Sequence, residues 1–457
     1  MSPGIHGAAP SGHRRLAGET HSLHPMELGP WLARAAARRP DGVALETPDE
    51  RLTYHELLLA ATRAAGRLVL RGAGPGDRVG IALPPGRAFI ATVHGCLLLR
   101  APAMPIDLRL SERERSELAR GAEVLVSQPL VDEAGSPFNL VDPEEDELAL
   151  VVHTSGTTRT PRPVELTFGH LAAHIRAAGA VLGSDPDERW LVPMPLSHVG
   201  GLMVLVRSAA AAGTVVLEPP PFDADRVARL LRDGDITLVS LVPTMLARIL
   251  EAGGRPGPRL RRVLLGGGPV PPGLLRRAVE AGWPVSQTYG LTEAGSTVTL
   301  AEPGDLETAG RPLPGLGVSI ADDGEINVHG PTVVGEWETL RTGDLGRLDA
   351  EGRLTVVGRK SDTIVSGGEN VAPAEVEAVL EEHPQVAEAG VFGRAHPQWG
   401  ESVTARIVPR GEVAPSAAEL RAYCAERLAG YKVPKAFEMA ERLPRTASGK
   451  LLRRKLT

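Results

Sequence analysis

The chain of 457 residues is poor in several residue types, and each shortage excludes a class of protein. Its two cysteines, Cys96 and Cys424, are far apart and outside any metal-ligand spacing, so we expect free thiols in a reducing, cytoplasmic compartment. The net charge of −6 provides no general basic field. Nucleic acid is therefore not an expected partner, and any anionic ligand must be held by a local site.

A long uncharged apolar segment is also lacking. Residues 199–217 come closest, but they contain Arg207, and an arginine at a bilayer centre costs roughly 2.5–3.5 kcal/mol. Gly213 and Thr214, followed by two valines, favour a helix that ends before a buried strand. Residues 1–24 have no apolar stretch typical of a signal peptide and are predicted to form a disordered tail. We therefore expect no stable membrane insertion.

Lysine is scarce, because arginine supplies 45 of the 50 basic residues and no lysine precedes residue 360. A lysine kept against this bias is a candidate for chemistry that a planar, permanently charged guanidinium cannot perform. The five lysines are Lys360, Lys432, Lys435, Lys450 and Lys455.

Helix and strand patterns alternate from residue 31 to about residue 290, which predicts an α/β fold with parallel sheet units and sites at strand ends. Two helices are expected between Trp31 and Val69, and residues 52–54 open the second one. Strands are predicted at 78–83, 148–152, 236–241, 262–265 and 285–288. Further helices are predicted at 223–232, 244–251 and 271–281.

The pattern changes near residue 310 to short strands separated by glycines, including 324–328 and 353–357, which predict a small β subdomain. An α+β module follows Arg359, with helices at 373–382 and 416–428 and strands at 386–392 and 402–408. The predicted division is a tail at 1–24, a large N-terminal domain of α/β sheets plus the β subdomain at 25–359, and a C-terminal domain at 360–457.

One loop organises the chain. The apolar run 148–152 leads into Thr154, Ser155, Gly156, Thr157 and Thr158, whose hydroxyls and backbone N–H groups can converge on a phosphate. A polar hairpin turn is the alternative interpretation. The loop is not a P-loop, because no Gly-Lys-Ser or Gly-Lys-Thr occurs in the chain.

Five more segments follow this loop in a fixed order. They are S-Q-T-Y-G-L-T-E at 286–293, R-T-G-D-L at 341–345, G-R-K-S-D at 358–362, S-G-G-E-N at 366–370 and P-R-T-A-S-G-K at 444–450. Together with T-S-G-T-T at 154–158, they resemble the acyl-adenylate-forming superfamily of acyl-CoA synthetases, peptide-synthetase adenylation domains and firefly luciferase. The resemblance covers roughly residues 25–457. It implies an enzyme that activates a carboxylic acid with ATP and Mg²⁺ and transfers the acyl group to CoA.

The residue types suit that chemistry. An aromatic ring at Tyr289 can lie against adenine, the Thr292 hydroxyl can reach the α-phosphate, and the Glu293 carboxylate can hold Mg²⁺. A strand end capped by Thr292 and Glu293 is the alternative. Asp344 has two acceptor oxygens for a ribose diol, and the resemblance implies that Arg359 donates to the ribose or a phosphate. The predicted nucleotide site contains Thr154, Ser155, Gly156, Thr157, Thr158, Gly267, Gly268, Tyr289, Gly290, Asp344 and Arg359.

The resemblance also assigns roles to residues in the C-terminal part of the chain. Lys450 corresponds to the lysine that stabilises charge between the substrate carboxylate and the α-phosphate, although a solvated tail lysine is the alternative. Ser361 occupies the position where the family pivots a mobile C-terminal domain between adenylation and thioester formation. Ser366, Gly367 and Gly368 would belong to a loop that serves the second step, and they also fit a simple turn before a helix.

Two departures from the family pattern concern the phosphate loop. Arg159 stands where glycine is common, and Arg162-Pro163 stands where Lys-Gly is usual. Arg162 still offers a cation to phosphate, but loop movement and the pyrophosphate contacts are put in question.

Several features indicate which carboxylic acid is the substrate. The stretch Pro195–Gly201 resembles the family segment in which a histidine, here His198, lines the acyl pocket; a buried histidine that caps the following helix is the alternative. The segments L-G-G-G-P at 265–269 and V-P-T-M-L at 242–246, with 361–370, resemble the o-succinylbenzoate–CoA ligases of menaquinone biosynthesis.

The acid of those ligases carries a second carboxylate. Arg207 is the candidate cation for that group, with Ser296 and Thr297 as donors from the opposite wall. An arginine paired with a structural carboxylate is the alternative. Another fatty or aryl acid–CoA ligase and a degenerate adenylate-binding protein without turnover also stay open, as does assembly into a homo-oligomer.

Overall fold

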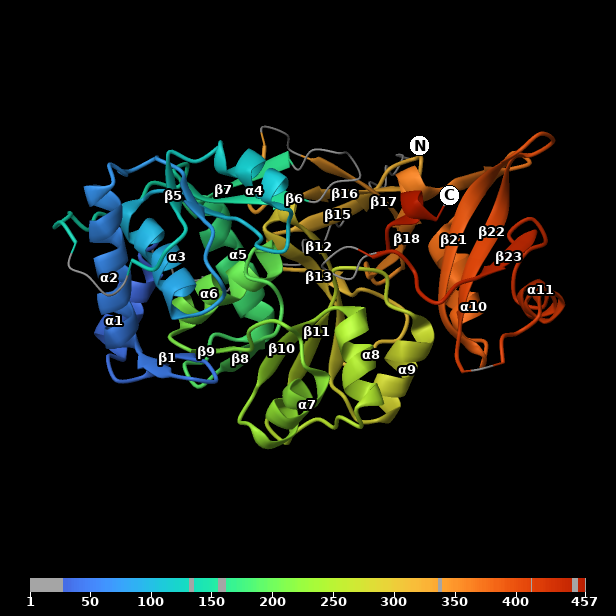
Figure 1. Cartoon of the computed structure of the whole chain (residues 1–457), viewed down its shortest axis with the longest axis horizontal. Helices are drawn as coiled ribbons and strands as arrows, with labels where there is room; N and C mark the ends of the chain where they lie inside the picture. The colour runs from blue at the N-terminus through green and yellow to red at the C-terminus, as the bar shows by residue number, and fades with distance from the viewer. Residues whose placement is uncertain are drawn as a thin grey trace, which may run out of the picture.

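The computed structural model describes residues 28–130, 135–154, 162–335, 339–411, 413–445 and 451–456. The predicted tail at 1–24 lies outside these residues. The described chain forms four β-sheets with helices packed around them (Figure 1). The predicted mixed α/β architecture, with a large N-terminal part and a smaller C-terminal part, is confirmed.

The first sheet has five strands in the order β5-β3-β4-β6-β7. Its strands are β3 (Val79–Ile81), β4 (Ala103–Pro105), β5 (Val124–Val126), β6 (Leu148–Thr154) and β7 (Arg162–Thr167). Only β7 runs antiparallel to its neighbour. The helices of this region are α1 (Trp31–Arg38), α2 (Tyr54–Leu70), α3 (Arg87–Leu99) and α4 (Glu112–Ala119).

The second sheet has nine strands in the order β14-β13-β12-β11-β10-β8-β9-β1-β2. They are β1 (Val43–Glu46), β2 (Arg51–Thr53), β8 (Arg189–Val192), β9 (Thr214–Leu217), β10 (Leu238–Leu241), β11 (Arg262–Leu265), β12 (Val285–Leu291), β13 (Ser296–Leu300) and β14 (Arg311–Pro312). Its helices are α5 (Phe168–Leu182), α6 (Val199–Ala211), α7 (Ala224–Asp233), α8 (Pro243–Glu251) and α9 (Pro272–Glu280). The strands β1 and β8–β12 pair in parallel, so their carboxyl ends share one edge.

A small antiparallel sheet follows the short helix η1 (Thr292–Ala294). Its strands are β15 (Gly317–Ile320), β16 (Glu325–His329), β17 (Leu340–Leu348) and β18 (Leu354–Arg359). Its buried face contains Ile326, Val328 and Leu354, which pack with Tyr289 and Ala294. The small sheet is therefore joined to the end of β12 by a shared core.

The C-terminal part has its own core and a five-stranded sheet. Its strands are β19 (Ile364–Ser366), β20 (Glu369–Val371), β21 (Val386–His396), β22 (Gly400–Pro409) and β23 (Ala436–Met439). Its helices are η2 (Lys360–Asp362), α10 (Pro373–Glu381), α11 (Ala417–Ala425) and η3 (Arg453–Lys455). In Figure 1 this part, in orange and red, lies at the opposite end of the molecule from α1 and α2.

Most predicted elements occur within a few residues of their expected bounds, but the region between the first two helices differs. The structure inserts the antiparallel pair β1–β2 there, joined by a turn in which Thr47 N–H donates to the Glu50 carbonyl (2.9 Å). Thr53 then caps α2 through a reciprocal pair of bonds with Glu56, which explains why residues 52–54 open that helix.

The apolar segment 199–217 forms α6 and the buried strand β9, as expected. None of the described helices is both long enough and apolar enough to cross a membrane. Cys96 and Cys424 are both buried free thiols, which confirms the expectation of no disulfide between them.

Tyr54 offers a stability test of the contact between α2 and the end of α6. Its buried hydroxyl donates to the carbonyls of Ser208 (3.0 Å) and Gly213 (2.6 Å). Tyr54→Phe should lower the free energy of unfolding by about 1–3 kcal/mol, because both buried carbonyls lose a donor. Urea unfolding measures the change. Tyr431→Phe, at a side chain that is 39% exposed, is the control and should shift stability much less. Equal shifts would contradict the role of the Tyr54 bonds.

Candidate functional site

The predicted nucleotide residues that the structure describes lie at the end of β6, just after β11, on β12, and on strands β17 and β18 of the small sheet. Thr154 is the last residue of β6 and lies opposite Arg162 of β7. The loop residues Ser155, Gly156, Thr157 and Thr158, and Arg159 with them, lie outside the described residues. Arg162 and Pro163 are exposed on β7, the edge strand of its sheet, where a missing N–H is tolerated.

Tyr289, Asp344 and Arg359 are brought together by three strands. The Tyr289 hydroxyl donates to Asp344 Oδ2 (3.0 Å), and Arg359 Nε donates to Asp344 Oδ1 (2.8 Å). Burial raises the pKa of Tyr289, and the Asp344 carboxylate raises it further, so the phenol stays a donor. A carboxylate is an acceptor-only group with two oxygens, which is the chemistry that recognition of a ribose diol requires.

Glycines allow the backbone to pass closely at this edge. A Cβ on Gly290 would lie 1.8 Å from the Ser296 carbonyl oxygen, where β12 and β13 pair with a bulge. Gly267 has φ +80°, a left-handed conformation that favours glycine, whereas Gly268 has open space around its Cα. Each of these three positions thus favours glycine for a different reason. A close backbone contact explains Gly290, a left-handed conformation explains Gly267, and Gly268 leaves room for a ligand.

Thr292 and Glu293 lie in η1, directly after β12. Glu293 is partly buried, and its carboxylate forms no ion pair with any described residue. The described residues also contain no cluster of three His, Cys, Asp or Glu side chains that could cage a metal. A single free carboxylate fits Mg²⁺ that arrives with phosphates, because Mg²⁺ commonly takes one or two carboxylates together with substrate oxygens.

Ser296 and Thr297 begin β13 and follow Gly295, which has φ +71°. Ser296 itself has φ +115°, an uncommon conformation for a residue with a side chain. Such strain tends to persist at ligand sites, where the surrounding structure holds it. Ser296 therefore lies just after η1, and its role in the wall of an acid pocket stays a prediction.

His198 occupies the N-cap position of α6, where its carbonyl accepts from the N–H groups of Gly201 and Leu202, but its side chain makes no cap bond. Arg109 Nη2 lies 3.2 Å from His198 Nε2. Because a guanidinium can only donate, Nε2 must accept and the proton lies on Nδ1. Burial and the charge of Arg109 lower the pKa of His198, while Asp107 opposes the shift. Asp107 and Arg109 were missed from the sequence.

Arg207 lies near the far end of α6 from His198 and is 8% exposed. Its Nε donates to the Met203 carbonyl (3.1 Å), so the side chain runs back toward the start of the helix, and its guanidinium lies 4.6 Å from the centre of the Trp190 ring. No ion pair to Arg207 occurs among the described residues, so the alternative of a structural carboxylate partner is wrong there. Its Nη1 is buried without a hydrogen-bond partner.

His174 of α5 and Thr332 also have unpaired polar atoms, and His174 lies close enough to Arg207 for their charges to interact. Both ring nitrogens of His174 and the Thr332 hydroxyl are fully buried without hydrogen bonds. Burial, with a smaller effect of Arg207, lowers the pKa of His174 well below its usual value. A Cβ on Gly295 would lie 3.7 Å from Thr332 and 3.9 Å from His174, so these side chains flank the turn before Ser296. Buried polar groups rarely stay unpaired, so this cluster suits a polar ligand.

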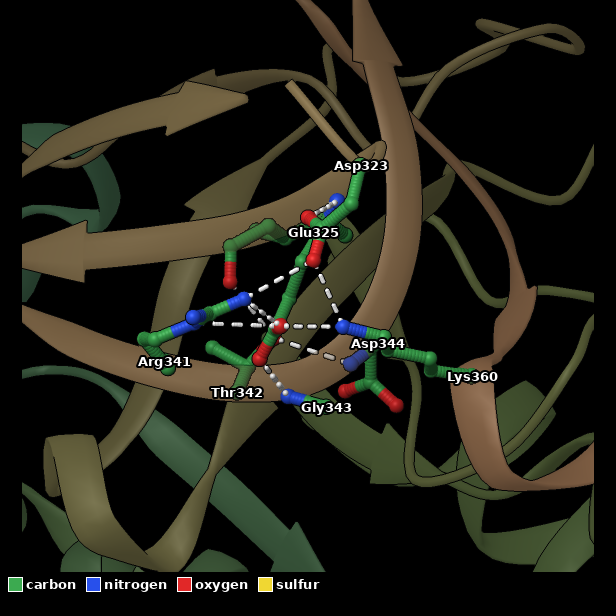
Figure 2. Close-up of polar contacts among 8 residues, drawn as sticks. Asp323, Glu325, Arg341, Thr342, Gly343, Asp344 and Lys360 are labelled. Atoms are coloured by element: carbon green, nitrogen blue, oxygen red, sulfur yellow. Dashed lines mark hydrogen bonds and ion pairs between the residues drawn. The ribbon is translucent and has the colours of Figure 1, made fainter. Parts of the chain in front are cut away.

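The segment around the predicted pivot is tied to the small sheet. Figure 2 shows the Glu325 carboxylate between Arg341 on one side and Lys360 on the other, with Asp323 beside them. Lys360 Nζ lies 2.6 Å from Asp323 Oδ2 and 3.2 Å from Glu325 Oε2. The Gly343 N–H donates to Glu325 Oε1 (2.9 Å), so the same carboxylate holds the part of β17 that carries Asp344.

The segment 366–370 forms a hairpin between β19 and β20. Gly367 and Gly368 have φ +63° and +87°, which suits a two-residue turn, and Ser366 pairs with Glu369. The interpretation as a turn before a helix is therefore correct for the fold, and a role in the second step remains a prediction. Lys450 lies outside the described residues.

Comparison with known proteins supplies the family. Residues 32–133 and 120–337 match the AMP-binding enzyme family, and residues 375–450 match the AMP-binding enzyme C-terminal domain. The chain is 38% identical to 2-succinylbenzoate–CoA ligase of Bacillus licheniformis, with 94% of this chain and 100% of the relative covered.

Solved structures agree with this match. The o-succinylbenzoate CoA synthetase of Bacillus subtilis, in complex with the acyl-adenylate intermediate OSB-AMP, is 37% identical with a TM-score of 0.87, and 93% of this chain and 97% of that chain are covered. A double mutant of the same enzyme, bound with its product analogue OSB-NCoA, has 37% identity and 93% and 98% coverage but a TM-score of 0.69. The present structure is thus closer in shape to the acyl-adenylate complex.

The superfamily resemblance carried by the six segments is confirmed by matches that span both the large and the small parts of the chain. On this evidence the chain belongs to the AMP-binding enzyme family.

Proposed function

We propose that this protein is an ATP-dependent carboxylate–CoA ligase that works through an acyl-adenylate and that its acid is 2-succinylbenzoate. The observation that carries the proposal is the 38% identity to a 2-succinylbenzoate–CoA ligase over the whole of that relative. The Tyr289–Asp344–Arg359 arrangement supports the nucleotide part, and the buried unpaired groups near Arg207 support the choice of acid.

The reaction has two steps. First, a carboxylate oxygen of the acid attacks the α-phosphorus of ATP, the bond to the bridging oxygen breaks, and pyrophosphate leaves. Second, the CoA sulfur bonds to the acyl carbon and loses its proton, while AMP leaves with the carboxylate oxygen. The protein must therefore stabilise negative charge at the α-phosphate and then present the acyl carbon to a thiol.

The chain's own residues suit the first step. Asp344 would accept bonds from the ribose, and Arg359, fixed by its bond to Asp344, would keep further N–H groups for the ribose or a phosphate. Thr292 would donate to the α-phosphate, and Lys450 would stabilise charge between the reacting carboxylate and that phosphate. Glu293 would hold Mg²⁺, which neutralises phosphate charge when it is bound with ATP.

The proposed acid pocket is formed by residues of α5, α6 and the start of β13. His198, neutral and tethered by Arg109, would line the pocket near the reacting end. Arg207 would pair with the second carboxylate of 2-succinylbenzoate, because its Nη1 has no protein partner among the described residues and a buried unpaired cation is costly. Ser296 and Thr297 would add hydroxyl donors.

The domain division belongs to the same proposal. Residues 25–359 would form the adenylate-forming domain and residues 360–457 the mobile domain, with Ser361 as the pivot. Hairpin residues Ser366, Gly367 and Gly368 would then reach the site during the second step. A direct assay distinguishes this proposal from its two alternatives, a ligase for another acid and an adenylate-binding protein without turnover.

A panel of acids tests the function. With ATP, Mg²⁺ and CoA, 2-succinylbenzoate should release pyrophosphate and form its CoA thioester at the highest kcat/KM. Benzoylpropionate, which lacks the ring carboxylate, should be at least about tenfold worse, because the buried cation is left unpaired. Medium-chain fatty acids and benzoate extend the panel. Preference for one of those acids, or nucleotide binding without any thioester, would overturn the proposal.

Arg207→Leu tests the cation. The variant should raise KM for 2-succinylbenzoate by about tenfold to a hundredfold, because a desolvated carboxylate loses its partner. Benzoylpropionate should become the better substrate of the two, since the unpaired charge opposing it is removed. Arg176→Leu, on α5 but outside the unpaired cluster, is the control. Unchanged selectivity between the two acids would exclude Arg207 from the pocket.

Ser361→Pro tests the pivot. Proline fixes φ near −65°, so pyrophosphate release without CoA should stay within about threefold of the wild type while thioester formation falls at least about tenfold. The two half-reactions are measured separately, the second with supplied acyl-adenylate. Ser361→Ala should behave like the wild type. Equal loss of both steps with a lower melting temperature would indicate misfolding and contradict the pivot.

A further inference from the structure

The residues on either side of Ser361 are ion-paired to different parts of the molecule. Lys360 bonds to the small sheet of the N-terminal part, and Asp362 bonds to Arg453 at the end of the chain. Among the described residues, the side chain of Ser361 bonds only to its own neighbour, with Oγ 3.3 Å from Asp362 Oδ1. The pivot proposed above therefore lies between two anchored residues.

The anchor before the pivot is built on a buried carboxylate. Glu325, whose side chain is 7% exposed, is held by the Gly343 N–H and by Arg341 Nη2 (2.5 Å) as well as by Lys360. Asp323 accepts from Arg341 (2.9 Å) and from Lys360 (2.6 Å). Figure 2 shows both cations converging on these two carboxylates. Lys360 is thereby joined to β16 and to the part of β17 that carries Asp344.

The anchor after the pivot is more buried. Arg453, whose side chain is 18% exposed, donates from Nη1 to Asp362 Oδ2 (3.0 Å) and from Nη2 to Glu377 of α10. Glu377 also accepts from the Val391 N–H (2.7 Å), so α10 and β21 share this centre. Asp362 is thus part of the C-terminal unit. In sequence, Arg453 follows Lys450 by three residues.

We propose that Lys360 and Arg453 are positioning residues for the two half-reactions: Lys360 fixes the pivot to the nucleotide-binding part, and Arg453 fixes residues 451–456 to the residue after the pivot. This inference rests on the proposed function and on Ser361 as its pivot.

The two anchors have different consequences. With its neighbours held, rotation is confined to the backbone of Ser361, so the C-terminal unit turns along one defined path. Without Lys360 the rotation would spread over several residues, and the second orientation would be reached less often. Without Arg453, residues 451–456 would lose their ion pair to Asp362, so the orientation used for adenylation would be less accurately fixed.

A purely structural role makes a different prediction. Exposed ion pairs contribute little to stability, and the Lys360 side chain is 46% exposed, so its loss should hardly change the melting temperature. Loss of the more buried Arg453 would leave Glu377 without its cation and would lower stability. Stability alone, however, would reduce both half-reactions together.

Lys360→Met tests the first anchor. Thioester formation from supplied acyl-adenylate and CoA should fall about tenfold, while pyrophosphate release without CoA stays within about twofold. Arg341→Met is the matched control, because it removes the other cation from the same two carboxylates without touching the pivot, and it should leave the thioester step within about twofold. An equal loss in both variants, or a Lys360→Met enzyme with wild-type thioester formation, would overturn this role.

Arg453→Met tests the second anchor with the opposite signature. Pyrophosphate release should fall at least about tenfold, thioester formation from supplied acyl-adenylate should stay within about threefold, and Arg453→Lys should recover part of the loss. Lys455→Met, an exposed cation two residues further on, is the control and should behave like the wild type. Equal loss of both steps in Arg453→Met would show a structural role only and contradict the inference.

The outcomes separate this inference from the proposed function. A wild-type enzyme that forms no thioester with any acid of the panel would remove the proposed function itself. An active wild type with variants that lack these opposite half-reaction signatures would remove only the roles of Lys360 and Arg453.

Discussion

The carboxylate of Asp344 is the contact on which the site depends. It is partly buried, and it takes one hydrogen bond from Tyr289 of the nine-stranded sheet and one from Arg359 at the end of the small sheet. Charge-assisted bonds of this kind are stronger than neutral ones and fix geometry well. Because Arg359 directly precedes Lys360, the same contact places the expected ribose position next to the start of the proposed pivot. Nucleotide binding and domain rotation would therefore act on one small group of residues.

The fold was largely predictable because its helices and strands carry strong local patterns. Strand β11 occurs at the predicted residues, and α8 and α9 begin and end within one residue of the prediction. The pair β1–β2 was missed because each strand is short and lies between two strong helical patterns. Such strands are stabilised by their neighbours in the sheet, here β9, and those neighbours are far away in sequence.

The candidate site was only partly predictable, for a related reason. Motifs of several residues, such as T-Y-G-L-T-E, can be recognised along the chain. His174, Asp107 and Thr332 are single polar residues within otherwise ordinary segments, and only folding brings them near the predicted pocket. His174 lies on an apolar helix where the sequence favours simple core packing. That its two ring nitrogens are buried and unpaired becomes visible only once its surroundings are known, and such groups suit a polar ligand.

The few lysines of this chain make different kinds of contact. Lys432 pairs with Glu375 (2.6 Å), so one of the few lysines has a structural partner, and scarcity alone does not mark a catalytic residue. Lys360 differs because its compact ammonium lies between two carboxylates, while the adjacent Arg359 uses a planar guanidinium to reach a third. A second guanidinium at position 360 would need a wider space and a fixed fork geometry. The side-by-side use of both cations therefore reflects different geometric demands on the two residues before the proposed pivot.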